Sequence, residues 1–260
     1  MMRLFLLAAL PLLAFALPAR AEDKPAHKET RLFELRVYTA QEGKLGAIHK
    51  RTKDAGLKLL EKHGMTVLGV WSPVDPKDAR FFLLLAHKDK AARDASFKAF
   101  ASDPDWVKVR DESEKDGKIV AKAEEMFLTA TDYSPMIKTG ESKDERVFEL
   151  RTYTATEGKL DNLNARFRDH TVKLFEKHGM TNWVYWNYLK GTKGDDAMLV
   201  YFITHASPDA AKKSFGAFAK DPDWVAARKA SEEKAGGSLT AAKDGVKSVY
   251  LKATDYSPTK

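Results

Sequence analysis

The sequence predicts an α+β fold in which two copies of one unit pack against each other through their sheets. Three observations predict this fold: the chain repeats itself, each repeat alternates strand and helix patterns in the same order, and the third strand pattern of each repeat is apolar at almost every position. A strand that is apolar on both faces needs cover on both faces. Helices cover one face, so the sheet of the other copy is expected to cover the second.

An internal duplication organises the chain. Residues 33–71 are identical to residues 148–186 at 22 of 39 aligned positions, a similarity that marks a repeated structural unit. Later matches need small insertions in the second copy, where loops are expected. We therefore divide the chain into a first domain over 31–135, a polar linker over 136–145 and a second domain over 146–258.

Each copy has the element order β-α-β-β-α-β. In the first copy, alternating or continuous apolar runs predict strands over 33–39, 66–71, 81–87 and 125–130, and helical apolar spacing predicts helices over 45–63 and 91–100. Asp103 followed by Pro104 predicts the start of a further helix. This order is that of a ferredoxin-like unit with an antiparallel sheet. Two such sheets packed face to face would form a closed or nearly closed barrel within one chain.

The N-terminus has the pattern of a secretory signal peptide over 1–21. Arg3 precedes an apolar run over 4–17, and small residues at Ala19 and Ala21 predict cleavage after Ala21. Residues 22–30 then form an N-terminal extension, and a periplasmic or secreted protein is expected. No second apolar stretch approaches the length of a membrane span, so none is expected after cleavage.

Composition excludes several kinds of chemistry. The chain has no cysteine, which excludes disulfides, thiol nucleophiles and thiolate metal sites. The formal net charge is +7, but lysines and acidic residues are interspersed along the chain. This pattern is typical of a solvated mixed surface, and no nucleic-acid partner is expected.

Five motifs, each present in both copies, resemble those of the NIPSNAP family within the dimeric α+β-barrel superfamily. They are Phe-Glu-Leu-Arg-x-Tyr-Thr at 33–39 and 148–154, Glu-Lys-His-Gly-Met at 61–65 and 176–180, the tryptophans Trp71 and Trp186, Asp-Pro-Asp-Trp at 103–106 and 221–224, and Thr-Asp-Tyr-Ser-Pro at 131–135 and 254–258. The resemblance implies two ferredoxin-like units around a cleft, an intrachain pseudo-dimer. The superfamily includes monooxygenases, haem-degrading and haem-binding proteins and isomerases, so it implies no single reaction.

The first strand of each copy carries a polar row. In both copies the apolar residues of this strand are expected to pack on the helices, which would turn the polar residues toward the barrel interior. Beside an apolar cavity, such a row could bind a carboxylate or an enol. The alternative, which we favour because both copies keep the set, is that these charges form structural ion pairs. The row consists of Glu34, Arg36 and Tyr38 in the first copy and of Glu149, Arg151 and Tyr153 in the second.

Three histidines are candidates for a site. His87 and His205 end the third strands, where they could reach the mouth of a cleft or lie on the surface. His170 falls on the apolar stripe of its helix, where the first copy has Ala55, so it is either a buried ligand of haem or a metal or a core histidine. No cluster has recognised metal spacing, and no metal site is predicted.

Aromatic residues gather in the second strand of the second copy. Trp183, Trp186 and their first-copy relative Trp71 are expected either to line a pocket for a flat ligand or to pack the interface. By simple alternation, Trp183 shares a strand face with Tyr185, and Trp186 shares the other face with Tyr188.

Two classes of function remain. The first is a protein of the cell envelope that binds a small molecule or a partner through the barrel cleft. The alternative is a small-molecule enzyme of the monooxygenase-like, isomerase-like or haem-linked kind. No cofactor is evident, and haem is the less favoured possibility. Any ligand site is expected inside the barrel, with the second copy dominant because only that copy carries His170 and the extra tryptophan.

Overall fold

A computed structural model describes residues 29–140, 142 and 146–260. The predicted signal peptide over 1–21, most of the N-terminal extension and part of the linker lie outside these described residues. The strands are β1 (Leu32–Ala40), β2 (Thr66–Pro73), β3 (Arg80–His87), β4 (Val120–Ala130), β5 (Val147–Thr154), β6 (Thr181–Tyr188), β7 (Met198–His205) and β8 (Val246–Ala253). The helices are α1 (Leu45–Arg51), α2 (Leu57–Lys62), α3 (Lys90–Ala101), α4 (Pro104–Ser113), α5 (Leu160–Arg166), α6 (Val172–Lys177), α7 (Pro208–Lys220) and α8 (Pro222–Lys234), with π-helical turns η1 (Thr52–Gly56) and η2 (Phe167–Thr171).

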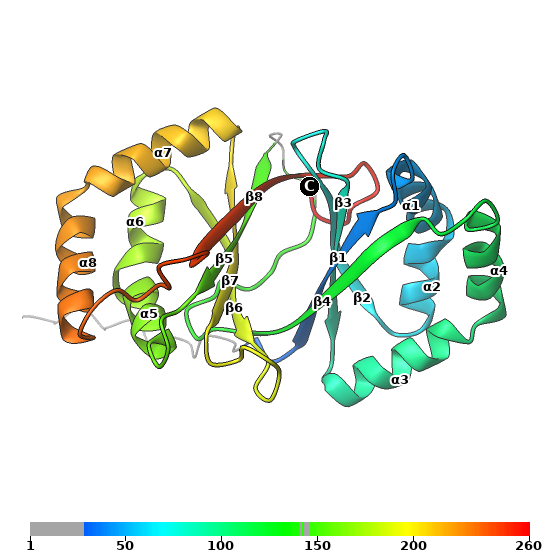
Figure 1. Ribbon diagram of the computed structural model, residues 1–260, viewed down its shortest axis with the longest axis horizontal. Coiled ribbons are helices and arrows are strands. Elements are labelled where there is room, and N and C mark those ends of the chain that lie inside the picture. Colours follow the sequence, from blue (N-terminus) through cyan, green and yellow to red (C-terminus); the bar gives the residue numbers. More distant parts are fainter. Residues whose placement is uncertain (1–28, 141, 143–145) are drawn as a thin grey trace, which may run out of the picture.

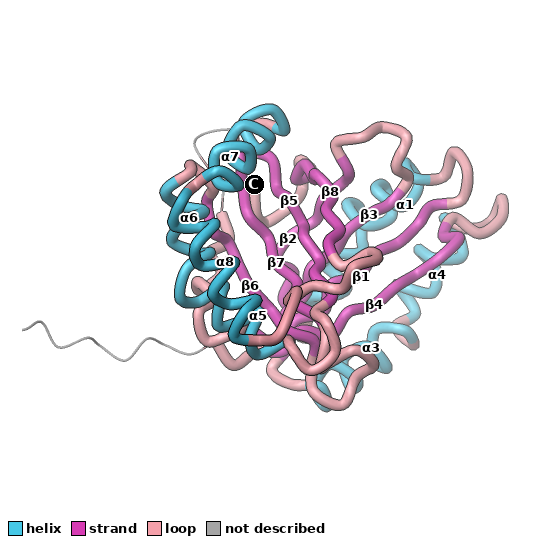
Figure 2. The backbone as a smooth tube through the Cα atoms, turned by 60° about the vertical axis from the view of Figure 1, so that its left-hand side comes forward, coloured by secondary structure: helices cyan, strands magenta, loops and turns pink. Residues whose placement is uncertain are grey.

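The eight strands form one closed antiparallel barrel. Its strand order is β1-β3-β2-β8-β5-β7-β6-β4, so β1 to β4 stay together as a first half and β5 to β8 as a second half. The halves join where β2 pairs with β8 and β4 pairs with β6. In Figure 1 the helices of the two halves lie on opposite outer sides, with the strands between them. Figure 2 shows α5 to α8 covering the outer face of their own sheet.

The third strand of each half is buried on both faces, as the sequence predicts. In β3, Phe82 and Leu84 belong to the core cluster inside the barrel, whereas Phe81, Leu83 and Leu85 pack under the helices. All five side chains are almost fully buried. The barrel interior and the helix layer are therefore two separate apolar cores that share a strand.

Each repeat ends in a motif that crosses to the other half. The Oγ of Ser134, from the first repeat, accepts a 2.9 Å hydrogen bond from the backbone N–H of Tyr185 in β6. The Oγ of Ser257, from the second repeat, accepts a 2.9 Å bond from the N–H of Val70 in β2. This reciprocal exchange fastens the halves together and explains why the motif recurs.

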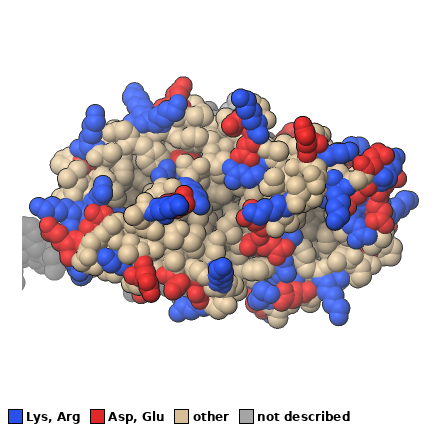
Figure 3. Space-filling view, in the orientation of Figure 1, with Lys and Arg blue, Asp and Glu red and all other residues tan. Residues whose placement is uncertain are grey.

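Among the described residues, the helices are too short or too polar to cross a bilayer. On the face seen in Figure 3, lysine and arginine side chains are interspersed with aspartate and glutamate. The same mixture is seen in the sequence.

Candidate functional site

The polar row of β1 faces the helices and not the barrel interior, so the predicted orientation is wrong. Glu34 accepts hydrogen bonds from Arg93 of α3, and the guanidinium of Arg36 lies 4.6 Å from the ring centre of Phe97 in α3. The barrel interior instead receives Phe33, Leu35 and Val37. The physical reason is that the closed interior has apolar side chains on every wall, whereas the helix layer supplies cations that can pair with a buried carboxylate.

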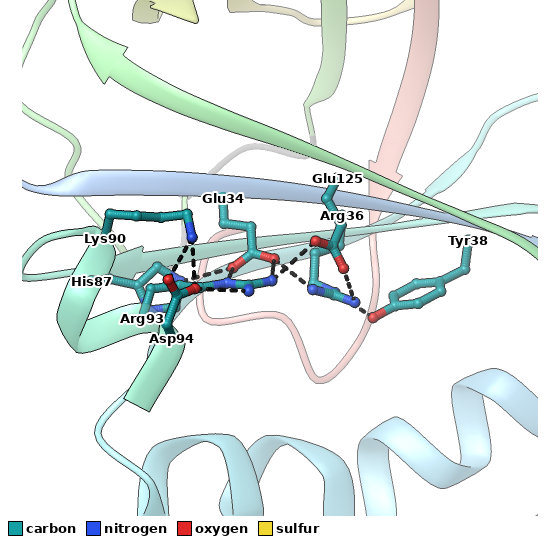
Figure 4. A network of polar contacts seen from close by, with 8 residues as sticks. All are labelled: Glu34, Arg36, Tyr38, His87, Lys90, Arg93, Asp94 and Glu125. Carbon is teal, nitrogen blue, oxygen red and sulfur yellow. Dashed lines mark hydrogen bonds and ion pairs between the residues drawn. The ribbon is translucent and has the colours of Figure 1, made fainter. Parts of the chain in front are cut away.

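Glu34 is the centre of a polar network in the first half (Figure 4). Its carboxylate is fully buried and accepts from Arg93 Nε at 2.9 Å and Arg93 Nη2 at 2.7 Å. Arg36 Nη1 donates at 2.5 Å, and His87 Nε2 lies 3.1 Å from Oε2. Burial by itself raises the pKa of Glu34, but the hydrogen bonds and charges of these partners outweigh it and hold the pKa at about 2.

Arg36 connects this network to a tyrosine. Its Nε donates to the hydroxyl of Tyr38 at 2.5 Å, and its Nη2 pairs with Glu125 of β4 at 2.7 Å. Burial by itself lowers the pKa of Arg36, but Tyr38 and Glu34 outweigh it and raise the pKa above its usual value. The prediction that Arg36 is a buried, paired cation is therefore confirmed.

The second half repeats only the centre of this network. Arg151 Nη1 donates to Glu149 at 2.5 Å, His205 Nε2 lies 2.9 Å from the same carboxylate, and Arg151 Nη2 contacts the hydroxyl of Tyr153 at 3.3 Å. Burial opposes the charge of Glu149, but His205 and Arg151 lower its pKa on balance. The paired state predicted for Arg151 is also confirmed.

The outer part of the network is missing from the second half. Ala211 occupies the position of Arg93. In the strand register, Arg151 lies opposite Ser248 of β8, whereas Arg36 lies opposite Glu125 of β4. A cation and an anion have thus been exchanged together for neutral residues. Glu34 consequently has two arginine partners, whereas Glu149 has one.

A cavity of about 170 Å³ lies beside this network, between the sheet of the first half and helices α1 to α4. Arg36, Tyr38 and Arg51 supply its main polar groups. Its remaining walls are largely apolar and are formed by Ile48, Thr52, Gly56, Leu60, Phe81, Leu83, Phe97, Phe100 and Trp106. A concave, mostly apolar pocket with a few convergent polar groups is the usual form of a small-ligand site.

The π-helical turn η1 forms one wall of this first-half pocket. Such turns insert one extra residue into a helix and occur often at functional sites. Gly56 is the buried residue of η1, and a Cβ added there would lie 3.4 Å from the backbone oxygen of Arg51. Gly56 lines the pocket, at the position where the second half has Thr171.

Larger side chains stand at two of the matching positions in the second half. Phe167 stands where the first half has Thr52, Tyr201 where it has Leu83, and the two rings lie 5.3 Å apart. The corresponding cavity has a volume of about 220 Å³. Arg228, Glu232 and Val246 belong to its lining but have no counterparts in the lining of the first-half pocket. Conversely, the first-half pocket is lined by Arg36, Leu83 and Phe97, whose counterparts do not line the second cavity. The two repeats have therefore diverged at this pocket: each cavity reaches the tyrosine of its polar row, Tyr38 or Tyr153, but only the first-half pocket is also lined by the arginine of the row, Arg36.

The tryptophans predicted as ligand candidates pack inside the barrel. Trp71, Trp183 and Trp186 all belong to the interior cluster, with Trp71 stacked 5.3 Å from Phe202. Trp183 does not share a face with Tyr185, because a register shift in β6 turns Trp183 to the interior and leaves Tyr185 under the helices. Of the two alternatives, interface packing is the one that the structure shows for these side chains. The polar row that was expected to line a site inside the barrel lies under the helices instead, and the interior cluster consists of aliphatic and aromatic side chains.

The three candidate histidines also differ from expectation. His87 and His205 are 3% exposed and lie beneath the helices, bonded to Glu34 and Glu149, so they are neither surface residues nor at a cleft mouth. His170 is exposed and Thr171 is buried in its place, because η2 adds a residue to the helix and shifts the buried stripe by one position. His170 is therefore neither of the two alternatives, a buried ligand or a core histidine.

Arg51, Arg93 and Glu125 were missed by the sequence reasoning. The paired loss of Arg93 and Glu125 in the second repeat was a usable signal, because two opposite charges disappear together. Arg51 is kept as Arg166 in the second repeat although the residues on either side of it differ between the repeats, and this was a second signal. Within residues 29–140, 142 and 146–260, no group of three or more histidine, aspartate or glutamate side chains could hold a metal ion.

The closed antiparallel barrel with helices outside defines an α+β-barrel protein of the dimeric type. The family model for NIPSNAP matches residues 33–135 and 148–244, which together include both repeats. The chain therefore belongs to the NIPSNAP family, and the resemblance seen in the five motifs is confirmed. No match was found among curated proteins.

Solved structures of the same fold have low sequence identity to this chain. A putative monooxygenase from Fusobacterium nucleatum is 10% identical, with a TM-score of 0.58, and the match covers 89% of this chain and 95% of that one. An anthrone oxidase-like protein is 14% identical, with a TM-score of 0.56 and coverage of 87% and 92%. A putative monooxygenase from Lactobacillus acidophilus is 13% identical, with a TM-score of 0.51 and coverage of 86% and 94%. At these identities the likeness shows the fold alone.

Proposed function

We propose that this protein binds a small aromatic carboxylate or enolate in the first-half pocket. The observation that carries the proposal is the pairing of apolar walls with Arg36, Tyr38 and Arg51 in one cavity of about 170 Å³. A dry cavity of about 150 Å³ accommodates benzene in another protein, so a ligand with one ring fits this volume. The divergence of the second repeat supports a single site in each chain.

Arg51 is the best placed anion partner in this pocket. Its Nη1 donates to Glu114 at 2.9 Å and to Ser113 at 3.3 Å, and its guanidinium lies 5.3 Å from the ring centre of Trp106. Among the described residues these bonds engage only one of its nitrogens, so other N–H donors remain for a carboxylate. Trp106 holds the guanidinium in place by a cation–π contact.

Benzoate titration by isothermal calorimetry tests the proposal. We expect saturable binding with one site per chain. Thr52→Phe reproduces the ring found at Phe167 and should weaken binding at least tenfold. Thr66→Phe, the same change at an exposed position of β2, is the matched control and should bind like the wild type. Equal affinity of Thr52→Phe and the wild type would remove the first-half pocket as the site.

A second candidate function is catalysis in the same pocket. Three solved structures of this fold are described as putative monooxygenases or as anthrone oxidase-like. Tyr38 accepts a hydrogen bond from Arg36, so its own hydroxyl proton can be donated to a bound enolate. Incubation with an enol that carries a single ring, such as the enol of phenylpyruvate, should show no ketonisation above the protein-free blank if the protein only binds. Turnover that Tyr38→Phe abolishes would favour the enzyme.

We also propose that each half is a ferredoxin-like unit and that the protein is exported. The half-sheet orders β4-β1-β3-β2 and β8-β5-β7-β6 support the first point. The signal-peptide pattern, with cleavage after Ala21, supports the second. N-terminal sequencing of protein from a periplasmic fraction should begin at Glu22. A chain that begins at Met1 or Met2 would contradict export by cleavage.

A further inference from the structure

Residues 120–126 of β4 form a free edge of the sheet, called here the β4 edge. On one side they pair with β1. On the other side β4 pairs with β6 only from Leu128 to Ala130, and the backbone oxygen of Phe127 accepts from the N–H of Leu189. In the part of the chain that the structure describes, the outer side of residues 120–126 makes no backbone hydrogen bond. Figure 2 shows β4 at the margin of the sheet, beside β1.

The β4 edge is open to solvent and regular. Every residue from Ala121 to Glu125 is exposed. The edge contains neither proline nor glycine, and its ladder with β1 is regular from Lys122 to Thr129. Proteins usually protect a free edge with a proline, a bulge, a covering element or charged side chains, because its unpaired N–H and C=O groups can bond to a further strand. Over this regular part only charges protect the edge, so their pattern decides which strand can pair with it.

The second half has a shorter edge with a different charge. When the closing motifs of the two repeats are aligned, β8 begins at Val246, the counterpart of Ala123, and Lys247 stands where the first half has Glu124. The contact of β8 with β2 is made by Leu251–Ala253 alone. A short contact is therefore enough to close the barrel, and closure does not require the long extension of β4.

The peptide groups of Ala123 point outward from the β4 edge. In an antiparallel strand, alternate residues direct both N–H and C=O to the same side. Phe127 directs its C=O away from β1, toward Leu189, so Glu125 and Ala123 also direct their peptide groups away from β1. Two copies of β4 can therefore pair about a two-fold axis at Ala123, with the N–H of each Ala123 donating to the C=O of the other.

The charges of the β4 edge are self-complementary in this register. Lys122 and Glu124 share one face of the strand and form a 2.8 Å ion pair within the chain. Pairing about Ala123 places Lys122 of each copy opposite Glu124 of the other, so the charges alternate in sign. Opposite charges across a ladder stabilise antiparallel pairing, whereas like charges destabilise it. On the other face, Glu125 lies opposite the small side chain of Ala121.

We propose that two copies of this chain pair antiparallel through their β4 edges, about a two-fold axis at Ala123. A second copy is the partner because the edge complements its own charges and its own hydrogen-bonding groups. This contact is separate from the β2–β8 and β4–β6 contacts that join the repeats, and it does not depend on the function proposed for the first-half pocket. One strand pair is small beside the roughly 800 Å² per partner of a standard stable interface, so the dimer is expected to be reversible.

Sedimentation velocity of the full chain over a wide range of concentration tests the proposal. We expect a reversible equilibrium between monomer and dimer. Lys122→Glu and Glu124→Lys each place like charges across the axis and should weaken self-association at least tenfold. Mixed together, these two variants should form a heterodimer, because every facing pair is then opposite in charge. Lys247→Glu makes the same change as Lys122→Glu at an exposed position of β8 and should dimerise like the wild type.

Ala123→Pro tests the backbone contact. The N–H of Ala123 points outward, so proline removes the bond at the axis without removing a bond to β1. This variant should be monomeric, with a circular dichroism spectrum like that of the wild type. If Ala123→Pro does not fold, the mixture of the two charge variants keeps the test decisive.

Three results would overturn the inference. The first is a wild type that stays monomeric at every concentration. The second is dimerisation of Lys122→Glu, Glu124→Lys or a folded Ala123→Pro as strong as that of the wild type. The third is a mixture of the two charge variants that forms no heterodimer.

Discussion

Replacement of Arg151 by methionine should destabilise the protein more than the same replacement of Arg36. Glu149 is fully buried, and its partners are Arg151 at 2.5 Å and the imidazole of His205 at 2.9 Å. Without Arg151 the carboxylate has no permanent cation, and breaking a buried pair in this way costs about 3–5 kcal/mol. Without Arg36, Glu34 keeps two bonds from Arg93, so the loss is closer to that of one hydrogen bond to a charged group, about 1.5–3 kcal/mol. Methionine retains much of the apolar contact of either arginine, which limits the cavity contribution.

Urea unfolding at pH 7, followed by tryptophan fluorescence, measures both free energies of unfolding. The control is Arg168→Met, which breaks an exposed pair with Asp132 and should cost about 0–1 kcal/mol. The cost of Arg151→Met should also shrink between pH 7 and pH 4, because the orphaned carboxylate can then take up a proton. The reasoning is refuted if Arg151→Met costs no more than Arg168→Met, or if Arg36→Met proves the more damaging change.

Three further outcomes are expected. The folded pKa of Glu34, about 2, lies below its ordinary value of 4.5, so the folded state binds fewer protons. About 3 kcal/mol of stability, fully present above pH 4.5, should therefore be lost between pH 4.5 and pH 2, and urea unfolding of Glu34→Gln should show a smaller loss across this interval. Gly69→Ala should cost roughly 2 kcal/mol or more in thermal unfolding, because a Cβ there would lie 2.0 Å from the indole of Trp71, whereas Gly46→Ala meets open space and should be neutral or stabilising. Residues 22–138 expressed alone should sediment as a dimer, because β2 and β4 would otherwise be left with unpaired edges, and a stable monomer would contradict the pseudo-dimer.

The repeat, the order of elements and the doubly buried third strand could all be predicted from the sequence. These features depend on local patterns, such as the helix start at Asp103 and Pro104, where the aspartate side chain accepts from the N–H of Asp105. The closed barrel could be predicted because the strand from Phe81 to Ala86 is apolar on both faces and the helices cover only one of them. Local chemistry and gross burial therefore determine most of the architecture.

The face of the first strand that points into the barrel could not be predicted. Alternation of apolar and polar residues defines two faces without saying which one meets the other sheet. The charged face of β1 is stabilised under the helices by Arg93 of α3, which supplies two bonds to Glu34. That partner lies 59 residues away in the sequence. Long-range compensation of this kind has no local signature.

Single-residue insertions in regular elements account for the other errors. The π-helical turn η2 moves the buried position from His170 to Thr171, and a register shift in β6 places Trp183 on the same side as Trp186. Composition does not reveal these insertions, yet each one reverses or rotates the side chains that follow. The candidate site consequently moved from the barrel interior to the helix layer.

The central claim is that the first-half pocket binds an aromatic carboxylate. The position of a brominated benzoate in a crystal tests this claim most directly. Crystals soaked with bromobenzoate should give one strong anomalous bromine peak per chain, in the first-half pocket between β1 and η1, with the carboxylate against Arg51. The second-half cavity of about 220 Å³ should hold no bromine, because Arg151 does not line it and Phe167 replaces Thr52 in its wall. A bromine peak inside the barrel, or equal peaks in both halves, would contradict the account.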